Sequence, residues 1–182
     1  MSIVLEPIDP RGSDRDRLIE FFSENVFPFH ANSGSRTPEQ AAAFVDSAGF
    51  VGDGGAAFWV VDPECGRVGL VRFDDLGDDT PMFDLRLDER HRGRGLGVPT
   101  LRAVTDHLFT TTSANRFEGQ TREDNIAMRT VFVRAGWSKE AHHRRAWPVG
   151  DGEVRDAVGY AILREEWETG NSVPVRWDDF RA

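Results

Sequence analysis

Apolar residues recur every three or four positions in four segments of the chain, and this spacing predicts helices. The first covers residues 13–27, begins with Ser13 as a capping residue and carries early acidic side chains. The second runs from Thr37 to about Ser47, with Pro38 at its first position. The third and fourth follow a glycine-rich stretch and Asn125, and their predicted buried stripes are Leu101, Val104, Thr105 and Leu108, and Met128, Val131, Phe132 and Ala135.

Seven shorter segments are apolar or alternate apolar and polar residues, and they predict strands. They cover residues 3–10, 56–62, 66–75, 81–88, 116–122, 138–147 and 154–163. In the segment 81–88, alternation places Asp84 and Arg86 on one face and Phe83, Leu85 and Leu87 on the other. The order of these elements predicts an α/β (α+β) fold with a mixed sheet rather than a regular βαβ winding, in a single domain over residues 1–182.

Composition narrows the class of protein. The chain has 182 residues, 39% hydrophobic and 29% charged, which is typical of a globular domain, and no apolar run is long enough to cross a membrane. A formal net charge of −9 argues against binding to nucleic acid, which depends on lysine and arginine neutralising phosphates. The only cysteine, Cys65, forms no internal disulfide, and no secretory signal opens the chain. We therefore expect a cytoplasmic protein.

The stretch "RGRGLG" at residues 92–97 holds three glycines and two arginines where the third helix begins. Glycine is the costliest residue to order in a helix apart from proline, so this turn needs a bare backbone for another reason. The first N–H groups of a helix have no internal partner and carry partial positive charge, and Arg92 and Arg94 add two cations. The turn therefore predicts an anion site. The alternative is a glycine-rich turn whose arginines are simply solvated.

Two other phosphate-binding motifs do not fit this turn. A dinucleotide fingerprint needs a third glycine, but the chain has Thr100 there, and a P-loop needs a Gly-Lys-Ser/Thr sequence, which is absent. An unrelated nucleotide- or phosphate-binding module remains an alternative.

Two motifs together resemble the GNAT superfamily of acyl-CoA-dependent N-acetyltransferases. "RGRGLG" resembles its Gln/Arg-x-x-Gly-x-Gly/Ala signature, and "NIAMRTVFVRAGW" is similar to its Asn-x-x-Ala-x-x-x-Tyr-x-x-x-Gly-Phe helix. The resemblance covers roughly Val60 to Trp167. The segment "DAVGYAILREEW" and the later "PVRWDD" resemble the branch of ribosomal-protein N-terminal acetyltransferases and their small-molecule relatives.

The resemblance implies a mostly antiparallel central sheet that splits between strands 4 and 5, with coenzyme A in the split. Its pyrophosphate is then expected on the glycine turn, and a backbone N–H near Leu85 to Leu87 is expected to polarise the thioester carbonyl. No metal is expected. The implied acetyl-CoA-binding residues are Leu85, Leu87, Arg92, Gly93, Arg94, Gly95, Leu96, Gly97, Val98, Asn125 and Phe132. For Asn125, capping its own helix is an equal alternative.

Direct transfer to an amine requires the loss of a proton, and two carboxylates that flank the expected split are candidate bases: Asp84 and Glu118. For each, the alternative is an outward-facing charge or an ion pair, with Arg86 or Arg116. The chain departs from the family at Phe132, where many members have a tyrosine proposed to protonate the leaving thiolate.

By analogy with the family, Phe29 and His30 are expected to line the acceptor site, although phenylalanines there are as readily core residues. The acidic run "DDLGDDT" at residues 74–80 either attracts a cationic amine or is a solvated loop. The expected function is acetyl transfer from acetyl-CoA to a primary amine of a small molecule or protein N-terminus. The alternative is a non-catalytic acyl-CoA-binding sensor. We expect neither nucleic acid nor a membrane as a partner, and a homodimer is possible.

Overall fold

The computed structural model describes residues 2–30, 33–47, 50–52, 54–150 and 152–177. Its elements follow the predicted order, with one additional short helix near the C-terminus and a single 3-10 turn before the glycines. They are β1 (Val4–Pro7), α1 (Arg15–Glu24), α2 (Pro38–Val45), β2 (Ala56–Asp62), β3 (Gly66–Asp74), β4 (Met82–Leu87), η1 (Glu89–His91), α3 (Gly97–Thr111), β5 (Arg116–Arg122), α4 (Ile126–Arg134), β6 (Ser138–Gly150), β7 (Glu153–Leu163) and α5 (Arg164–Thr169).

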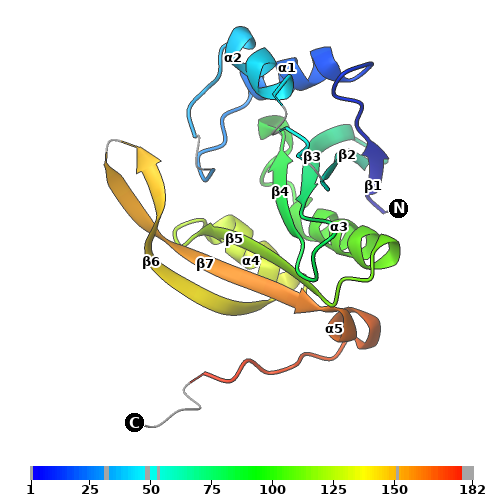
Figure 1. Ribbon diagram of the computed structural model, residues 1–182, viewed down its shortest axis with the longest axis vertical. Helices are drawn as coiled ribbons and strands as arrows, with labels where there is room; N and C mark the ends of the chain where they lie inside the picture. The colour runs from blue at the N-terminus through cyan, green and yellow to red at the C-terminus, as the bar shows by residue number, and fades with distance from the viewer. Residues whose placement is uncertain (1, 31–32, 48–49, 53, 151, 178–182) are drawn as a thin grey trace.

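The strands form two antiparallel sheets, in the orders β1-β2-β3-β4 and β5-β7-β6. The division falls between β4 and β5, which confirms the predicted split between the fourth and fifth strands. At one end the sheets still touch, because the backbone N–H of Glu118 donates to the carbonyl of Pro81 at 3.2 Å. From this point β4 and β5 separate, and the two sheets form the arms of a V (Figure 1).

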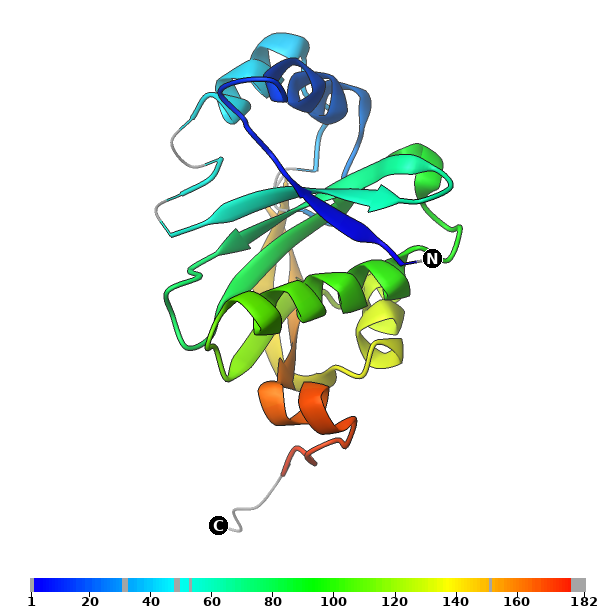
Figure 2. The same ribbon diagram turned by 90° about the vertical axis from the view of Figure 1, so that its right-hand side faces the viewer.

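Helices cover both faces of the first sheet, as Figure 2 shows. On one face α1 and α2 pack a phenylalanine-rich core, which includes Phe22 and Phe50, against Trp59 and Leu70 of the sheet. On the other face α3 packs all four residues of its predicted stripe, so that prediction is confirmed. Leu101, Val104 and Leu108 of that stripe join the larger core, which continues to Phe132 and Trp137 beneath the second sheet. The first sheet is therefore held rigidly from both sides.

Helix α1 differs from its prediction at both ends. It begins at Arg15, after Asp14 rather than Ser13. The carboxylate of Asp14 does not cap the helix, because it accepts from the N–H of Asp9 at 3.0 Å and from Nε1 of Trp59 at 2.9 Å. The helix ends at Glu24, because the side chain of Asn25 donates to the carbonyl of Phe21 and the backbone turns extended. Residues 26–30 therefore lie outside the helix and extend toward the V.

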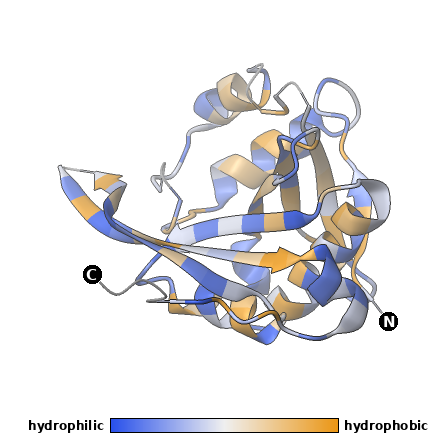
Figure 3. Cartoon of the chain, turned by 60° about the horizontal axis from the view of Figure 1, so that its bottom comes forward, coloured by the Kyte–Doolittle hydropathy of each residue, from blue (hydrophilic) through white to orange (hydrophobic). Residues whose placement is uncertain are grey.

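The strands β6 and β7 form a long hairpin that extends beyond the rest of the second sheet (Figure 1). Residues Ala157 to Ile162 are buried at the end of β7 that leads into α5, and this end is correspondingly hydrophobic in Figure 3. The free end of the hairpin mixes polar and apolar residues and is largely exposed. The hairpin carries Trp147 toward the V, which becomes important for the site.

Candidate functional site

Two connected chambers of about 400 Å³ each lie between the arms of the V. The first, here called the turn chamber, lies against the glycine turn and the start of α3. The second, here called the arginine chamber, lies against α2, β3 and the hairpin. The chambers share six lining residues, and this shared wall joins them into one cleft: Phe29, His30, Leu85, Arg86, Asn125 and Met128.

The glycines of the turn have two different structural roles. Gly93 and Gly95 have φ values of 73° and 83°, which strongly favour glycine, and the space beside them is open. Gly97 is needed for packing, because a Cβ atom there would lie 2.6 Å from Cγ2 of Val131 on α4. The turn therefore leaves backbone open to the turn chamber while α3 and α4 approach closely behind it.

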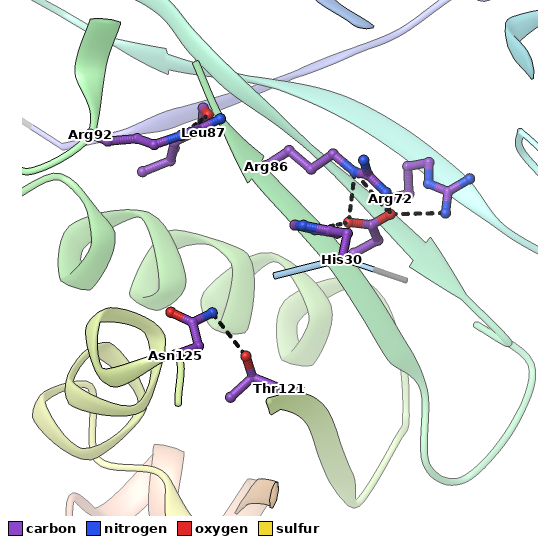
Figure 4. Close-up of polar contacts among 8 residues, drawn as sticks. His30, Arg72, Arg86, Leu87, Arg92, Thr121 and Asn125 are labelled. Carbon is purple, nitrogen blue, oxygen red and sulfur yellow. Dashed lines mark hydrogen bonds and ion pairs between the residues drawn. The ribbon is translucent and has the colours of Figure 1, made fainter. Parts of the chain in front are cut away.

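The two arginines of the turn lie in different environments. Nε of Arg92 donates to the carbonyl of Leu87 at 3.0 Å, and its guanidinium lies 5.1 Å from the ring centre of Phe27 (Figure 4 shows the bond to Leu87). Burial lowers the pKa of Arg92, and its Nη2 has no hydrogen-bond partner among the described residues. Arg94 is exposed to solvent. Arg92 therefore holds the end of β4 against the loop after α1, and it also lines the turn chamber.

Helix α4 forms the wall of the turn chamber opposite β4. The side chain of Asn125 accepts from the N–H of Met128 at 3.2 Å and donates to Oγ1 of Thr121 at 2.9 Å (Figure 4), so the capping role is confirmed. Asn125 also lines both chambers. Of the predicted buried stripe of α4, only Phe132 is fully buried, because Met128 and Val131 face the cleft.

Phe132 is 1% exposed and stacks on Tyr160, with ring centres 4.6 Å apart and an angle of 5° between the planes. It belongs to the larger core and touches the edge of the arginine chamber. The hydroxyl of Tyr160 accepts from Nε of Arg129 at 3.3 Å.

The polar face of β4 is buried beside α1 and α2 rather than exposed. Asp84 lies in this layer, and three side chains converge on it (Figure 4). His30 contacts it through Nε2 at 3.0 Å, Arg72 through Nη2 at 3.1 Å and Arg86 through Nη2 at 2.8 Å. The ion pair between Asp84 and Arg86 that the sequence offered as an alternative is thus present.

Burial by itself raises the pKa of Asp84, but the hydrogen bond from His30 and the Arg86 guanidinium beside it outweigh this effect. Together they hold the pKa of Asp84 well below its usual range. The group is therefore a carboxylate at any working pH. It anchors His30 and the arginines of the cluster.

Glu118 lies near the closed end of the V, where its backbone donates to Pro81. Its carboxylate pairs with Arg116 at 3.1 Å, and Arg116 also contacts Glu140. Glu118 is not among the described residues that line either chamber. The structure thus brings Asp84 and His30 together in the cleft and places Glu118 in an ion-pair network apart from them.

Sequence reasoning missed three side chains of the arginine chamber: Arg36, Arg72 and Trp147. Arg72 was detectable in principle, because it interrupts the apolar run from Val68 to Phe73 in β3. Arg36 and Trp147 carried no signal, because they come from a loop and from a distant hairpin.

Within the described part of the chain, no three side chains of His, Cys, Asp or Glu come together as a metal site would require. No helix within the same residues combines the length and apolar character needed to cross a bilayer.

The fold is also found in solved acetyltransferases. A spermidine N-acetyltransferase from Vibrio cholerae, solved in complex with CoA and spermine, superposes with a TM-score of 0.77 at 15% identity over 92% of this chain and 99% of that one. A GNAT-family acetyltransferase from Bacillus anthracis gives a TM-score of 0.73 at 21% identity over 91% and 97% of the two chains. These likenesses confirm the predicted fold. They do not support the ribosomal-protein branch in particular.

The family itself is established by sequence. Residues 2–138 match the acetyltransferase (GNAT) domain. The match covers most of the chain and includes the glycine turn, β4, β5 and α4. The protein therefore belongs to the GNAT family of acetyltransferases.

Proposed function

We propose that the protein transfers an acetyl group from acetyl-CoA directly to a primary amine of a small molecule or a protein N-terminus. The observation that carries the proposal is the cleft itself. It joins an open glycine turn at the start of α3 to a histidine paired with a buried carboxylate. The spermine and CoA bound to the Vibrio cholerae neighbour are consistent with an amine acceptor and with this cosubstrate.

The turn chamber fits coenzyme A. Gly93 and Gly95 leave the backbone open, and the first N–H groups of α3 favour an anion such as a pyrophosphate. Leu85, Leu87 and Asn125 line the path from this turn toward His30. Bound there, acetyl-CoA supplies the acetyl group as a thioester. We assign the predicted residues that line the turn chamber to this role, including Leu96, Gly97 and Val98 at the helix start. Arg94 is exposed beside the turn, and Phe132 lies in the core instead.

His30 is the base in this proposal, and Asp84 positions it. When Nε2–H of His30 donates to Asp84, Nδ1 is the proton acceptor, and this atom is buried without a partner among the described residues. A lysine-type amine has a pKa of about 10.4 and an α-amino group about 8, so either must lose a proton to react. Once the amine is neutral, its nitrogen attacks the acetyl carbon and gives one proton to Nδ1 of His30. The carbon–sulfur bond then breaks, and coenzyme A leaves as the thiolate.

Asp84 is a poor base itself, because its lowered pKa leaves it little tendency to take up a proton. β4 is the last strand of its sheet, and we propose that a backbone N–H between Leu85 and Leu87 stabilises the oxyanion. Phe132 has no hydroxyl, so the thiolate leaves without a tyrosine acid. A non-catalytic acyl-CoA sensor predicts no thiol release on any amine, and a thiol-release assay over an amine panel separates the two functions.

The whole chain, residues 1–182, is proposed to act as one domain, and a homodimer remains a prediction that sedimentation will decide.

CoA is expected to raise the melting temperature of the protein. A ligand that binds only the native state adds about 2.7 kcal/mol at a concentration one hundred times its Kd. Thermal melts with millimolar CoA, ATP and NAD measure this effect. A shift with CoA alone supports the assignment of the turn chamber, and no shift with CoA would contradict it.

Gly95→Val is expected to weaken CoA binding by at least about tenfold, because the new side chain stands over the backbone that a pyrophosphate approaches. The left-handed φ of 83° also adds strain of roughly 1–2 kcal/mol. Gly170→Val is the matched control, since Gly170 has a φ of 71° at the end of α5 and lines neither chamber. Calorimetry on both variants is decisive: equal CoA affinities would place the phosphate site elsewhere.

A further inference from the structure

The arginine chamber is unusually cationic for a protein whose net charge is −9. Three arginines line it and only one carboxylate does, that of Asp84, among the described residues. The acidic residues Asp75, Asp78 and Asp79 line a separate hollow on the β3–β4 loop. Asp74 acts electrostatically on Arg72 but does not line the chamber. The lining therefore carries more positive than negative charge.

Part of this positive charge is not used by the fold. Arg86 is 7% exposed, and while its Nε and Nη2 bond to Asp84, its Nη1 is buried with no partner among the described residues. A buried donor without a partner costs stability unless a ligand supplies the acceptor. Nε1 of Trp147, also on the chamber wall, is a second buried donor without a partner in the same part of the chain.

Arg36 provides the clearest unused cation. Within the described residues it makes no hydrogen bond or ion pair, and its guanidinium lies 4.6 Å from the ring centre of Phe44. Burial lowers the pKa of Arg36, and the nearby Arg86 and Arg72 lower it further, against the opposing effect of Asp84. Holding like charges together in this way is unfavourable, and an anion between them relieves it.

We infer that the acceptor is an amine that also carries an anionic oxygen group, a carboxylate or a phosphonate, which binds between Arg36 and Arg86. This inference rests on the proposed function. The amine then lies at His30, where the two chambers meet, and the anion points into the arginine chamber. Phe29, Phe44 and Trp147 suit an apolar or aromatic side chain beside the two groups. A polyamine, the ligand of the Vibrio cholerae neighbour, is repelled by the same arginines.

A panel of matched acceptors tests the charge requirement. Thiol release from acetyl-CoA is measured with L-phenylalanine, its carboxamide, phenethylamine, the corresponding α-aminophosphonate, and spermidine. We expect the carboxylate or the phosphonate to exceed the neutral amines in kcat/KM by about tenfold or more, which corresponds to 1.4 kcal/mol. Comparison of those two compounds identifies the anion. Faster turnover of spermidine or of the neutral amines would overturn the inference and leave N-acetyl transfer intact.

The variant Arg36→Gln tests the arginine itself. It is expected to raise KM for the anionic acceptor about tenfold, to change kcat little and to leave the neutral amines unaffected. Arg11→Gln, which removes one exposed arginine from the turn before α1, is the charge-matched control and is expected to behave as wild type. An equal KM for wild type and Arg36→Gln would contradict the assigned anion site.

A binding measurement separates this inference from the proposed function. The probe is 3-phenylpropionate, which has the anion and the aromatic body but no amine, with 3-phenylpropanamide as its neutral counterpart. Calorimetry on the CoA-loaded protein is expected to show binding of the carboxylate, weakened in Arg36→Gln, and no comparable binding of the amide. Carboxylate binding without turnover of any amine would uphold the anion site and refute amine acetylation. Absence of carboxylate binding would refute the anion site.

Discussion

His30→Gln is expected to lower kcat by about 10²–10⁴, the usual contribution of a general base. Glutamine keeps a side-chain N–H for Asp84, so the buried carboxylate retains a partner, but it has no nitrogen that takes up a proton at neutral pH. The measurement is thiol release under saturating acetyl-CoA from pH 6 to 10. The deficit is expected to shrink at high pH, where the amine deprotonates without help.

Two results would contradict the role of His30 as a base. One is a loss of less than about threefold, too small for the loss of a general base. The other is a loss of equal size at every pH, which indicates that His30 only positions the acceptor. Glu118→Gln is the companion variant, because Glu118 was the second base considered and lies in an ion pair with Arg116. We expect its kcat to stay near wild type, and a larger loss than in His30→Gln would make Glu118 the base.

Asp84→Asn is expected to destabilise the protein by about 3–5 kcal/mol, the usual cost of breaking a buried ion pair by removing one partner. Arg86 is almost fully buried, and the neutral amide removes the carboxylate charge with which it pairs at 2.8 Å. For a chain of this size the loss corresponds to a fall in Tm on the order of 10 °C. Thermal and denaturant unfolding of both proteins at neutral pH measures it.

The stability difference between wild type and Asp84→Asn is expected to depend on pH. Since the folded-state pKa of Asp84 is lowered, its contribution is fully present above the pKa of an unfolded aspartate, about 3.9, and is lost as the pH falls below that value. The gap between wild type and Asp84→Asn should therefore be constant near neutrality and narrow below about pH 4. Asp46→Asn is the control, because Asp46 pairs with Arg15 at the exposed surface and its loss should change stability little. An Asp84→Asn variant as stable as wild type would show that the arginines do not need this carboxylate.

Local pattern was sufficient for most of the fold. The 3.6-residue period of α3 and the alternation of β4 are read directly from neighbouring residues, and so is the Asn125 cap, because the interactions that form these elements are local. The split between the sheets came from the resemblance of two motifs to a family, since no local signal states which strands fail to pair. The helix end at Glu24 was missed because Asn25 bonds back to Phe21.

The composition of the site was decided by tertiary structure. His30 and Asp84 lie 54 positions apart, and their hydrogen bond depends on how the loop after α1 packs on β4. From the sequence, the charges of β4 were predicted only to share one face of the strand. In the structure α1 and α2 cover that face, and Asp84 and Arg86 form an internal ion pair. Gly97 was read as an opening for an anion, but it is the approach of Val131 that requires it. By itself the sequence determined the elements and the position of the glycine turn, because these depend on adjacent residues. Only the fold decided which distant charges meet, because burial and long-range packing set both their distances and their protonation.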